Sequence, residues 1–488
     1  MSKINCFLSS NTPGVWEECM AELRASSLVN RVYLFGQERP GELPEDCGFI
    51  PTDGKFSTHA VRKIADHSNG AGYTLILTRE TGIRLGMLAL ERFLEVASGT
   101  GVGMVYSDYY DSGDGKLSAH PVIDYQAGSL RDDFEFGPLL FYRSAALVRA
   151  VAGISESLEF AGLYQLRLKV SQQGLPWRIP EYLYSVEQLD TRDSGKKMFD
   201  YVDPKNREVQ VEMEKAATTH LKEVGAYLKP EFETIRFEEA DFPVEASVII
   251  PVLNREKTVA DAIESVMTQE CDFEFNLILV DNHSTDRTTA MVKELAARYP
   301  RLIHVIPERR DLGIGGCWNV GIHHPQCGKF AIQLDSDDLY AGKDTLKLIV
   351  EAFYEQQCAM VVGSYQMCNF QLEEIPPGLV DHREWTPENG RNNALRINGL
   401  GAPRAFYTPV LRKINIPNVS YGEDYGVGLA ISRYYQIGRI YKPLYLCRRW
   451  EDNSDASLSV EAQNKHNTYK DRLRSFELAA RIKLNAQR

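Results

Sequence analysis

Short apolar runs rich in β-branched residues alternate, from residue 247 onward, with longer stretches in which apolar residues recur at helical spacing. The short runs predict strands and the longer stretches predict amphipathic helices. Apolar strands separated by helix-length segments are typical of a parallel sheet with helices on both faces. We therefore predict an α/β fold whose strands are SVIIPV (247–252), NLILVD (276–281), IHVIPE (303–308), FAIQLD (330–335) and AMVVGSY (359–365).

The same order of apolar and polar positions recurs before residue 200. Matched segments lie about 260 residues apart, which favours a duplicated domain over chance similarity between unrelated α/β segments. The pairs are YTLILTRETGIRLGMLALERFLE from 73 with FAIQLDSDDLYAGKDTLKLIVEAFYE from 330, GMVYSDYY from 103 with AMVVGSYQ from 359, and IPEYLYSVEQLDTRDS from 179 with YKPLYLCRRWEDNSDAS from 441.

Between the two similar regions, apolar residues at helical spacing predict a helix from Asn206 to about Leu228, which Lys229 and Pro230 end. An extended connector follows. The predicted domains are a first α/β domain (1–195), a helical linker (196–245), a second α/β domain (246–460) and a C-terminal segment (461–488).

The C-terminal segment predicts a basic amphipathic helix. Leu473, Phe476, Ala480 and Leu484 fall on one helical face, and basic residues outnumber acidic ones around them. We favour packing of this face against the rest of the chain. Docking on a partner or on an anionic membrane surface is the alternative.

The composition excludes several classes of protein. Hydrophobic residues make up 43% of the 488 residues and charged residues 25%, as in ordinary globular domains. The net charge of −12 argues against nucleic-acid binding, and nine scattered cysteines without a CxxC pair argue against disulfides or structural zinc. No apolar run approaches the ~18 residues of a membrane span, and the start MSKINCFLSS lacks the basic and apolar regions of a signal peptide. We expect a cytoplasmic protein without a transmembrane segment.

Acidic residues gather where the strand FAIQLD ends. Two carboxylates about 5 Å apart near a surface repel by roughly 3 kcal/mol, so the cluster Asp335, Asp337 and Asp338 is best explained by a bound divalent cation. An acidic surface loop is the alternative. Asp281 also ends a predicted strand, and ligands of parallel α/β sheets bind beyond the carboxyl ends of the strands. The acids are therefore expected to converge on one crevice.

Five motifs, in this order and spacing, resemble the family 2 glycosyltransferases with the GT-A fold: SVIIPVLNREKTV, LILVDNHSTDRT, GIGGCWNVGI, FAIQLDSDDLY and YGEDYGVGLAISR. The resemblance covers about residues 245–460. It implies a GT-A nucleotide-sugar-binding (Rossmann-like) fold, here as two tandem GT-A-like domains joined by a helical linker. It also implies a metal-dependent inverting transferase that moves a sugar from a UDP- or GDP-sugar to a hydroxyl of a glycan, glycolipid or small molecule.

The resemblance assigns roles to individual residues. Asp281 would bind the base, with Pro251 to Asn254 as the opposite wall; Asp335 and Asp337 match the DxD motif that holds Mn²⁺ or Mg²⁺, with Asp337 as direct ligand and Asp335 contacting ribose or metal-bound water. Capping is favoured for Asp286. The donor-binding positions it implies are Pro251, Asn254, Asp281, Gly315, Asn319, Asp335, Arg448 and Arg449.

The resemblance names Asp424 as the general base that takes the acceptor's proton, while Glu423 orients groups. Stabilisation of a helix N-terminus is the structural alternative for both acids. Trp318 and Trp450 replace a usual Arg and a usual His, so Arg448 or Arg449 would clamp phosphate. The third metal ligand stays open between Asp452 and Asn453.

Two further regions complete the interpretation. Residues 370–406 would shape the acceptor pocket through Arg383, Trp385, Arg391, Asn392, Asn393 and Arg396. In the first domain, Thr78, Arg79, Glu80 and Thr81 stand where residues 335–338 stand, and Phe160 falls opposite Asp424. We therefore predict a first domain without DxD, not catalytic, that serves packing, acceptor binding or a homodimer.

Two alternatives to glycosyl transfer remain. A nucleotidyltransferase would need a basic triphosphate loop after the first strand, and PVLNREKTVAD contains Arg255 and Lys257 but lacks that loop's glycines. A noncatalytic glycan-binding or assembly protein suits the first half but leaves the DxD and GED motifs unexplained.

Overall fold

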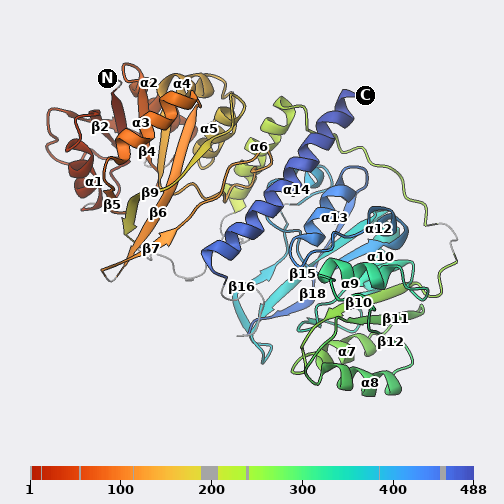
Figure 1. The fold of residues 1–488 in the computed structure, drawn as a ribbon. Helices are drawn as coiled ribbons and strands as arrows, with labels where there is room; N and C mark the ends of the chain where they lie inside the picture. The colour runs from red at the N-terminus through yellow and green to blue at the C-terminus, as the bar shows by residue number, and fades with distance from the viewer. Residues whose placement is uncertain are drawn as a thin grey trace. The chain divides into compact units, whose positions relative to one another are not determined.

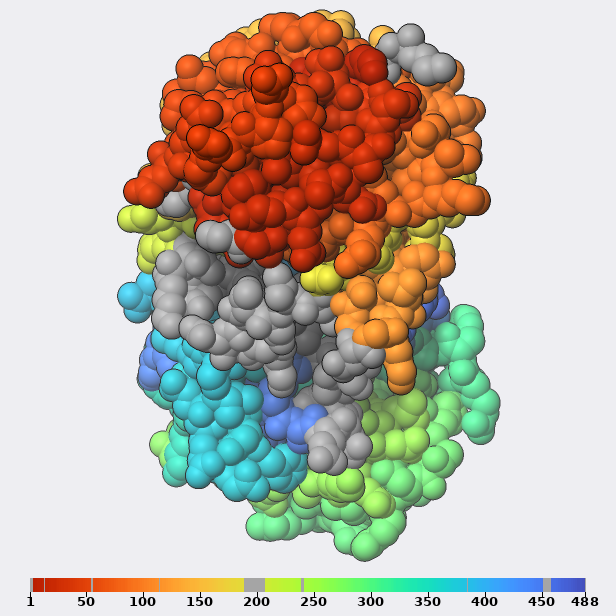
Figure 2. Space-filling view, turned by 90° about the vertical axis from the view of Figure 1, so that its left-hand side faces the viewer, coloured from red at the N-terminus to blue at the C-terminus, as the bar shows by residue number. Residues whose placement is uncertain are grey.

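The computed structural model describes residues 3–12, 14–53, 56–113, 115–187, 207–237, 241–383, 385–450 and 458–487. These residues form two compact units (Figure 1). The first comprises the described residues up to 187, from 207 to Tyr227 and from Ser459 onward, and the second those between Leu228 and Leu458. In Figures 1 and 2 the first unit begins in red and orange, and the second runs from green to blue.

The first unit is built on a mixed sheet of nine strands among its described residues, in the order β3-β2-β1-β4-β8-β6-β9-β5 with β7 beside β6. β1, β2, β3 and β4 are parallel, and β8 runs antiparallel between β4 and β6. The strands are β1 (Ile4–Ser9), β2 (Val29–Gly36), β3 (Cys47–Pro51), β4 (Tyr73–Leu77), β5 (Ile83–Leu85), β6 (Met104–Gly113), β7 (Lys116–His120), β8 (Leu139–Arg143) and β9 (Trp177–Glu187).

The second unit repeats this strand order. Its nine described strands are arranged β12-β11-β10-β13-β17-β15-β18-β14, with β16 beside β15. The strands are β10 (Ala246–Val252), β11 (Phe275–Asp281), β12 (Leu302–Val305), β13 (Phe330–Gln333), β14 (Leu339–Tyr340), β15 (Met360–Cys368), β16 (Glu374–Val380), β17 (Arg404–Tyr407) and β18 (Ile437–Arg448).

The predicted strands of the second unit are all present, but the sheet is mixed where a parallel sheet was expected: β14, β16 and β17 each pair antiparallel with a neighbour. β10, β11, β12 and β13 are parallel, whereas β17 runs antiparallel between β13 and β15. The run RAFY of β17 is only four residues long and ends the segment we interpreted as an acceptor-pocket excursion. A strand this short gives little periodicity from which to predict it.

In both units, helices alternate with strands along the chain, and α14 follows the last strand (Figure 1). Those of the first unit are α1 (Val15–Arg24), α2 (Thr58–Ser68), α3 (Ala89–Thr100), α4 (Ser144–Ala152), α5 (Gly162–Ser171), α6 (Arg207–Glu223) and α14 (Val460–Ala486). Those of the second are α7 (Val259–Met267), α8 (Thr288–Arg298), α9 (Ile314–Ile322), α10 (Thr345–Gln356), α11 (Gly390–Asn393), α12 (Thr408–Ile414) and α13 (Glu423–Ser432). No helix of the described chain is both long and apolar enough to cross a membrane.

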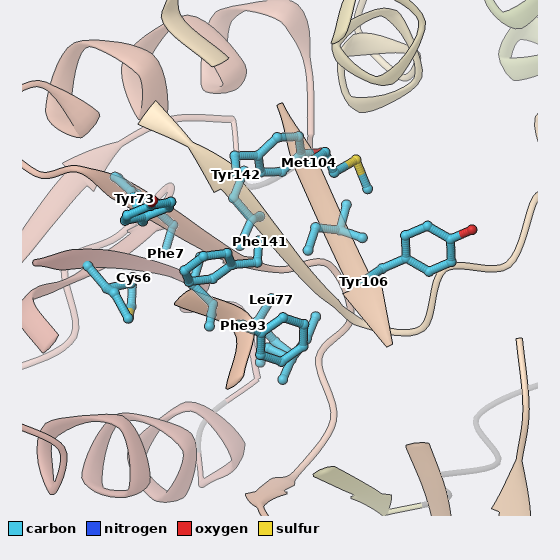
Figure 3. Close-up of a cluster of buried hydrophobic side chains, with 14 of the residues drawn as sticks. Cys6, Phe7, Tyr73, Leu77, Phe93, Met104, Tyr106, Phe141 and Tyr142 are labelled. Carbon is cyan, nitrogen blue, oxygen red and sulfur yellow. The ribbon is translucent and has the colours of Figure 1, made fainter. Parts of the chain in front are cut away.

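Aromatic rings fill the core of the first unit. Phe141 of β8 stacks on Tyr73 of β4 with ring centroids 5.2 Å apart, and on Phe93 of α3 at 5.5 Å (Figure 3). The stacked rings join both neighbouring strands and a covering helix, which such contacts stabilise beyond the burial of their area. The first unit therefore has a core of its own, independent of the second.

The predicted helices at 206–228 and 461–488 exist, but the units divide the chain differently from the predicted boundaries. α6 and α14 both belong to the first unit instead of forming a linker and a separate segment. Asp471 of α14 is fully buried and accepts hydrogen bonds from Ser129 (2.9 Å) and Arg131 (3.3 Å). The C-terminal helix thus packs against its own chain, as favoured.

The predicted apolar face of α14 is wrong. Phe476 is 62% exposed, and the buried positions are largely charged. Arg131 of the first unit supplies an opposite charge for Asp471, so a charged face can be buried here. These buried residues are Lys470, Asp471, Arg474, Glu477, Leu478 and Arg481.

Candidate active site

The carboxyl ends of β10, β11 and β13 lie at one edge of the second sheet, because the three strands are parallel neighbours. Asp281 ends β11 and is fully buried. Its Oδ1 accepts the Ser284 amide at 2.9 Å, its Oδ2 accepts the Thr289 hydroxyl at 2.5 Å, and His304 Nε2 lies 3.5 Å from Oδ2. Burial raises the pKa of Asp281, but these three contacts outweigh it and hold that pKa well below its usual value. Base binding by Asp281 stays a prediction.

The loop after β10 is fastened to the loop after β11. Asn254, in the left-handed region with φ of 53°, accepts the Thr285 amide at 2.8 Å and donates its own amide to Ser284 Oγ at 3.0 Å. Asp286 Oδ1 accepts the Thr288 amide at 2.9 Å in the first turn of α8, which is the capping role favoured from sequence. Asn254 therefore shapes the wall predicted to face the base, beside Pro251 of β10.

The DxD motif follows β13 directly. Asp335 accepts two hydrogen bonds from Gln333 Nε2, at 2.9 and 3.0 Å, and its amide donates to the Tyr445 hydroxyl at 3.1 Å. Burial, and next the charge of Asp335, raise the pKa of Asp337 against the lowering effect of Arg255, whose Nε lies 3.8 Å from Asp337 Oδ2. The two carboxylates thus lie close enough to repel one another in a partly desolvated turn.

Asp338 and Arg448 support the DxD turn through hydrogen bonds. The buried Asp338 carboxylate accepts the Arg448 amide at 2.8 Å, and burial together with the charges of Asp337 and Asp335 raises the pKa of Asp338 well above its usual value. The Arg448 side chain is 2% exposed; it donates to the Asp337 carbonyl at 2.5 Å and to Asp261 at 2.9 Å. The structure therefore places Arg448 as a support of the turn, where we had expected a phosphate clamp.

Glu423 and Asp424 open α13, as predicted for the GED motif. Asp424 Oδ2 forms an ion pair of 2.9 Å with Arg404 Nη1. Glu423 Oε2 is buried without a hydrogen-bond partner, and burial, followed by the charge of Asp424, raises the pKa of Glu423 to about 7. The two adjacent acids therefore have different surroundings.

Arg404 connects the GED motif to the DxD motif. Its side chain pairs with Asp424, while its amide donates to Gln333 Oε1 at 3.1 Å, and the same Gln333 side chain donates to Asp335. The charges of Asp424 and Asp335 both raise the pKa of Arg404 against burial. The metal-binding and base candidates thus lie in one site.

The donor set suits a hard divalent cation, because Asp335 and Asp337 offer carboxylate oxygens that repel one another in a partly desolvated turn. Within the described ranges, no group of three or more His, Cys, Asp or Glu side chains has a metal-binding arrangement. The Trp450 indole Nε1 lies 3.5 Å from Asp337 Oδ2, where the family's His is expected. Asp452 and Asn453, our candidates for a further ligand, lie outside the described residues.

Residues 247–413 match the family model of glycosyl transferase family 2. This segment is a family 2 glycosyltransferase domain. It contains the DxD turn, and the GED motif follows a few residues beyond its end.

Curated relatives of the family 2 domain include proteins of Bacillus subtilis and Staphylococcus aureus. The minor teichoic acid biosynthesis protein GgaB of Bacillus subtilis (strain 168) is 27% identical over 240 residues, which is 46% of this chain and 25% of GgaB. The poly(ribitol-phosphate) beta-N-acetylglucosaminyltransferase TarS of Staphylococcus aureus (strain Mu50 / ATCC 700699) is 35% identical over 173 residues, 35% of this chain and 29% of TarS. The match thus spans only about a quarter to a third of the length of these relatives.

Solved structures with a partial likeness include TarS residues 1–349 in complex with UDP-GlcNAc, at 23% identity and a TM-score of 0.39 over 47% of this chain and 66% of that chain. The mannosyltransferase PcManGT of Pyrobaculum calidifontis in complex with GDP-Man and Mn²⁺ has 17% identity and a TM-score of 0.33, over 55% of this chain and 84% of that chain.

Gly315 and Asn319, two of the donor-binding positions that the resemblance implies, both lie in α9. Gly315 lies inside α9, and a Cβ there would meet the Pro417 carbonyl oxygen at 1.9 Å. Asn319 exchanges hydrogen bonds with the main chain of Ile416, at 2.7 and 2.9 Å. Both residues therefore hold the segment that leads into the GED motif, and these contacts account for them without a ligand. Trp318 is buried against Phe406 in the core.

The predicted acceptor residues of segment 370–406 are mostly buried. Arg391 donates to main-chain carbonyls of Lys229, Glu231 and Ser432, and Asn392 bonds both the amide and the carbonyl of Leu228. These side chains fasten the connector after α6 to α13, so the expectation that they face an acceptor is wrong. Buried with them are Trp385, Asn393 and Arg396, whereas Arg383 is paired with Asp381 nearer the surface.

Sequence reasoning missed three residues that organise the site, namely Arg404, Gln333 and Tyr445. Gln333 is the polar residue in the otherwise apolar strand FAIQLD, and a buried amide in a strand needs partners, so it carried a usable signal. Arg404 and Tyr445 carried none, because their partners lie 20 and 110 residues away in the sequence. The Arg449 amide bonds the Cys368 carbonyl at 2.8 Å, and its predicted phosphate role stays a prediction.

Proposed function

We propose that the second unit is a metal-dependent, inverting glycosyltransferase that moves a sugar from a nucleotide-sugar donor to a hydroxyl of an acceptor. The observation that carries the proposal is a chain of contacts inside a family 2 domain. Asp424 pairs with Arg404, the Arg404 amide bonds Gln333, and Gln333 bonds Asp335, so the base candidate lies near the DxD turn. An acidic loop or a helix-capping pair would not require this convergence.

In this proposal Asp335 and Asp337 hold Mn²⁺ or Mg²⁺ against the donor diphosphate. The cation would neutralise charge on the departing nucleoside diphosphate. Gln333 and Tyr445 fix Asp335, while Arg448 and Asp338 fix the turn from beneath. The rigid turn then presents both carboxylates in one orientation, which a site must do before it can select the in-line geometry of attack.

Asp424 acts as the general base. The acceptor oxygen attacks C1 of the donor sugar, the bond from C1 to the diphosphate oxygen breaks, and the acceptor's proton passes to the Asp424 carboxylate. One in-line displacement inverts the anomeric centre. Arg404 orients the carboxylate through its 2.9 Å ion pair. Asp281, with Pro251 and Asn254, is the proposed base-binding wall.

The first unit is proposed to be a GT-A-like copy without transferase activity. Its strand order equals that of the second unit, yet Glu80 at the DxD position is bound by Ser9 at 2.7 Å, Asn11 at 2.9 Å and Thr12. Counted from the starts of α5 and α13, Leu163 stands opposite Asp424, in place of the predicted Phe160. Neither residue carries a group that accepts a proton.

The test is a panel of donors with Mn²⁺, with and without EDTA. UDP-GlcNAc and GDP-mannose belong in the panel because TarS is named an N-acetylglucosaminyltransferase and both bases are open. Release of nucleoside diphosphate that EDTA abolishes supports the proposal. Pyrophosphate released from a nucleoside triphosphate would point to a nucleotidyltransferase, and no turnover with any donor and acceptor would favour a binding protein.

Two variants test the residue roles. Asp424→Asn should lose at least about 100-fold in turnover while keeping donor affinity, because a base contributes roughly 10²–10⁴-fold. Asp337→Asn should weaken binding of the Mn²⁺-nucleotide complex. Glu294→Gln, on the exposed face of α8, is the control that should change neither property. Unaltered turnover in Asp424→Asn would remove it as the base.

A further inference from the structure

Two basic side chains lie beside the DxD turn on the loop between β10 and α7. Arg255 Nε is 3.8 Å from Asp337 Oδ2. Lys257 Nζ lies 5.4 Å from the centre of the Trp450 ring, and the Nε1 of that ring is 3.5 Å from the same Oδ2. Both cations therefore border the carboxylate proposed to hold the metal, one directly and one across an indole.

The loop that carries them is held in place by hydrogen bonds from its main-chain amides to side-chain oxygens of Thr288 and Asp286. The Arg255 amide donates to Thr288 Oγ1 at 2.8 Å, and the Glu256 amide donates to Asp286 Oδ2 at 3.1 Å. A loop fixed before binding loses less conformational entropy when it meets a ligand. The two side chains are therefore presented from a prepared backbone.

Charge balance indicates what they meet. A nucleoside diphosphate brings about two or more negative charges, whereas a divalent cation on two carboxylates has no net charge, so phosphate binding needs further positive groups. Arg404 is engaged by Asp424, and Arg448 is 2% exposed and engaged by Asp261. The Arg255 side chain is 22% exposed and Lys257 is exposed, so a ligand can reach both.

We propose that Arg255 and Lys257 bind the diphosphate of the donor and of the nucleoside diphosphate product, and that Trp450 is the platform that keeps Lys257 beside Asp337. When a cation occupies the carboxylate, Arg255 turns from Asp337 to a phosphate oxygen. Arg is suited to this because its planar donors match phosphate geometry, and Lys contributes a point charge. This inference rests on the proposed function.

The test is calorimetric titration of UDP, GDP, UMP and GMP, each with Mn²⁺, into the full chain. Arg255→Gln should weaken binding of the preferred diphosphate by about 10- to 100-fold and Lys257→Gln by about 3- to 10-fold, in line with charge-assisted hydrogen bonds. Affinity for the matching monophosphate should change by less than about 3-fold. Lys293→Gln, on exposed α8, is the matched control, and Arg255→Lys should recover part of the affinity.

Three outcomes would overturn the inference. Unchanged diphosphate affinity in both Gln variants is the first, and an equal loss for monophosphate and diphosphate is the second. In the third, titration of Mn²⁺ alone changes in Arg255→Gln while nucleotide binding does not, which would make Arg255 only a counter-ion of Asp337. If the unaltered protein binds neither diphosphate, the proposed function itself fails. If the unaltered protein binds a diphosphate and the Gln variants bind it equally well, only this inference fails.

Discussion

Glu423 and Asp424 are adjacent in the chain but differ in what surrounds each carboxylate. Asp424 faces a guanidinium at 2.9 Å, while Glu423 Oε2 is buried without a partner. Pairs of acids whose surroundings separate their protonation are typical of sites that move protons. Asp424 is thus held in an ion pair with Arg404, beside a Glu423 whose raised pKa keeps its proton to higher pH.

The raised pKa of Glu423 predicts a pH dependence of stability. Its pKa of about 7 in the folded state lies above the usual value of 4.5, so the folded state binds the proton more tightly and stability falls as pH rises between these values. Glu423→Gln should remove this fall. Its free energy of unfolding, relative to that of the unaltered protein, should therefore rise by on the order of 2 kcal/mol between pH 4.5 and pH 8. Thermal unfolding of both proteins in EDTA, from pH 4.5 to 8, measures it. Parallel curves for the two proteins would contradict the assignment.

Site residues were predictable where the chemistry is local. The three aspartates after β13 repel one another and could be interpreted from sequence alone, and the GED pair sits where a helix begins. The arginines were not predictable in the same way. The support that Arg448 gives the turn was not predictable, because its partner Asp261 lies in α7, far away in the sequence.

At the scale of elements, α9 illustrates how a motif can serve packing. Gly315→Ala would drive a methyl group into the Pro417 carbonyl, so the segment before the GED motif must shift. Overpacking of this kind costs about 1–3 kcal/mol. We expect a lower melting temperature together with slower transfer, since Asp424 follows that segment. Gly99→Ala in α3, where a Cβ meets open space, is the control and should cost nothing.

The C-terminal helix offers a second test at this scale. Gly128 lies against α14 so closely that a Cβ would meet the Ser475 amide nitrogen at 2.1 Å. Gly128→Ala should therefore loosen α14 and expose it to limited proteolysis, whereas Gly113→Ala, with open space around its Cβ, should not. Equal cleavage of both variants would mean that α14 is held by other contacts.

The two units share one strand order but differ in the polar residues at the DxD position. Glu80→Gln should leave glycosyl transfer within about 2-fold of the unaltered enzyme, because the Glu80 carboxylate is occupied by Ser9, Asn11 and Thr12 of the segment that follows β1. The same assay on Asp337→Asn supplies the contrast. A large loss in Glu80→Gln would show that the first unit takes part in catalysis.

The fold was predictable to the extent that its strands are long and apolar. β10, β11 and β13 follow from continuous apolar runs, and the repeated order of such runs indicated two similar domains. β17 was missed because four residues give no clear period. The buried face of α14 was misassigned because its charges are paired, Arg474 with Asp471 and Arg481 with Glu477 inside the helix and Asp471 also with Arg131, and a search for apolar positions does not reveal such pairs.

The assignment of α14 to the first unit has a consequence for synthesis. The first unit lacks its last helix, and with it Asp471, one of two carboxylates that pair with Arg131, until the entire second unit has been translated. Until then Arg131 keeps its ion pair with Asp133 but lacks the buried Asp471 carboxylate, so one buried charge contact of the finished unit is missing. Ribosome-stalled intermediates cut before residue 459 should therefore be less protease-resistant in their N-terminal half than the finished polypeptide.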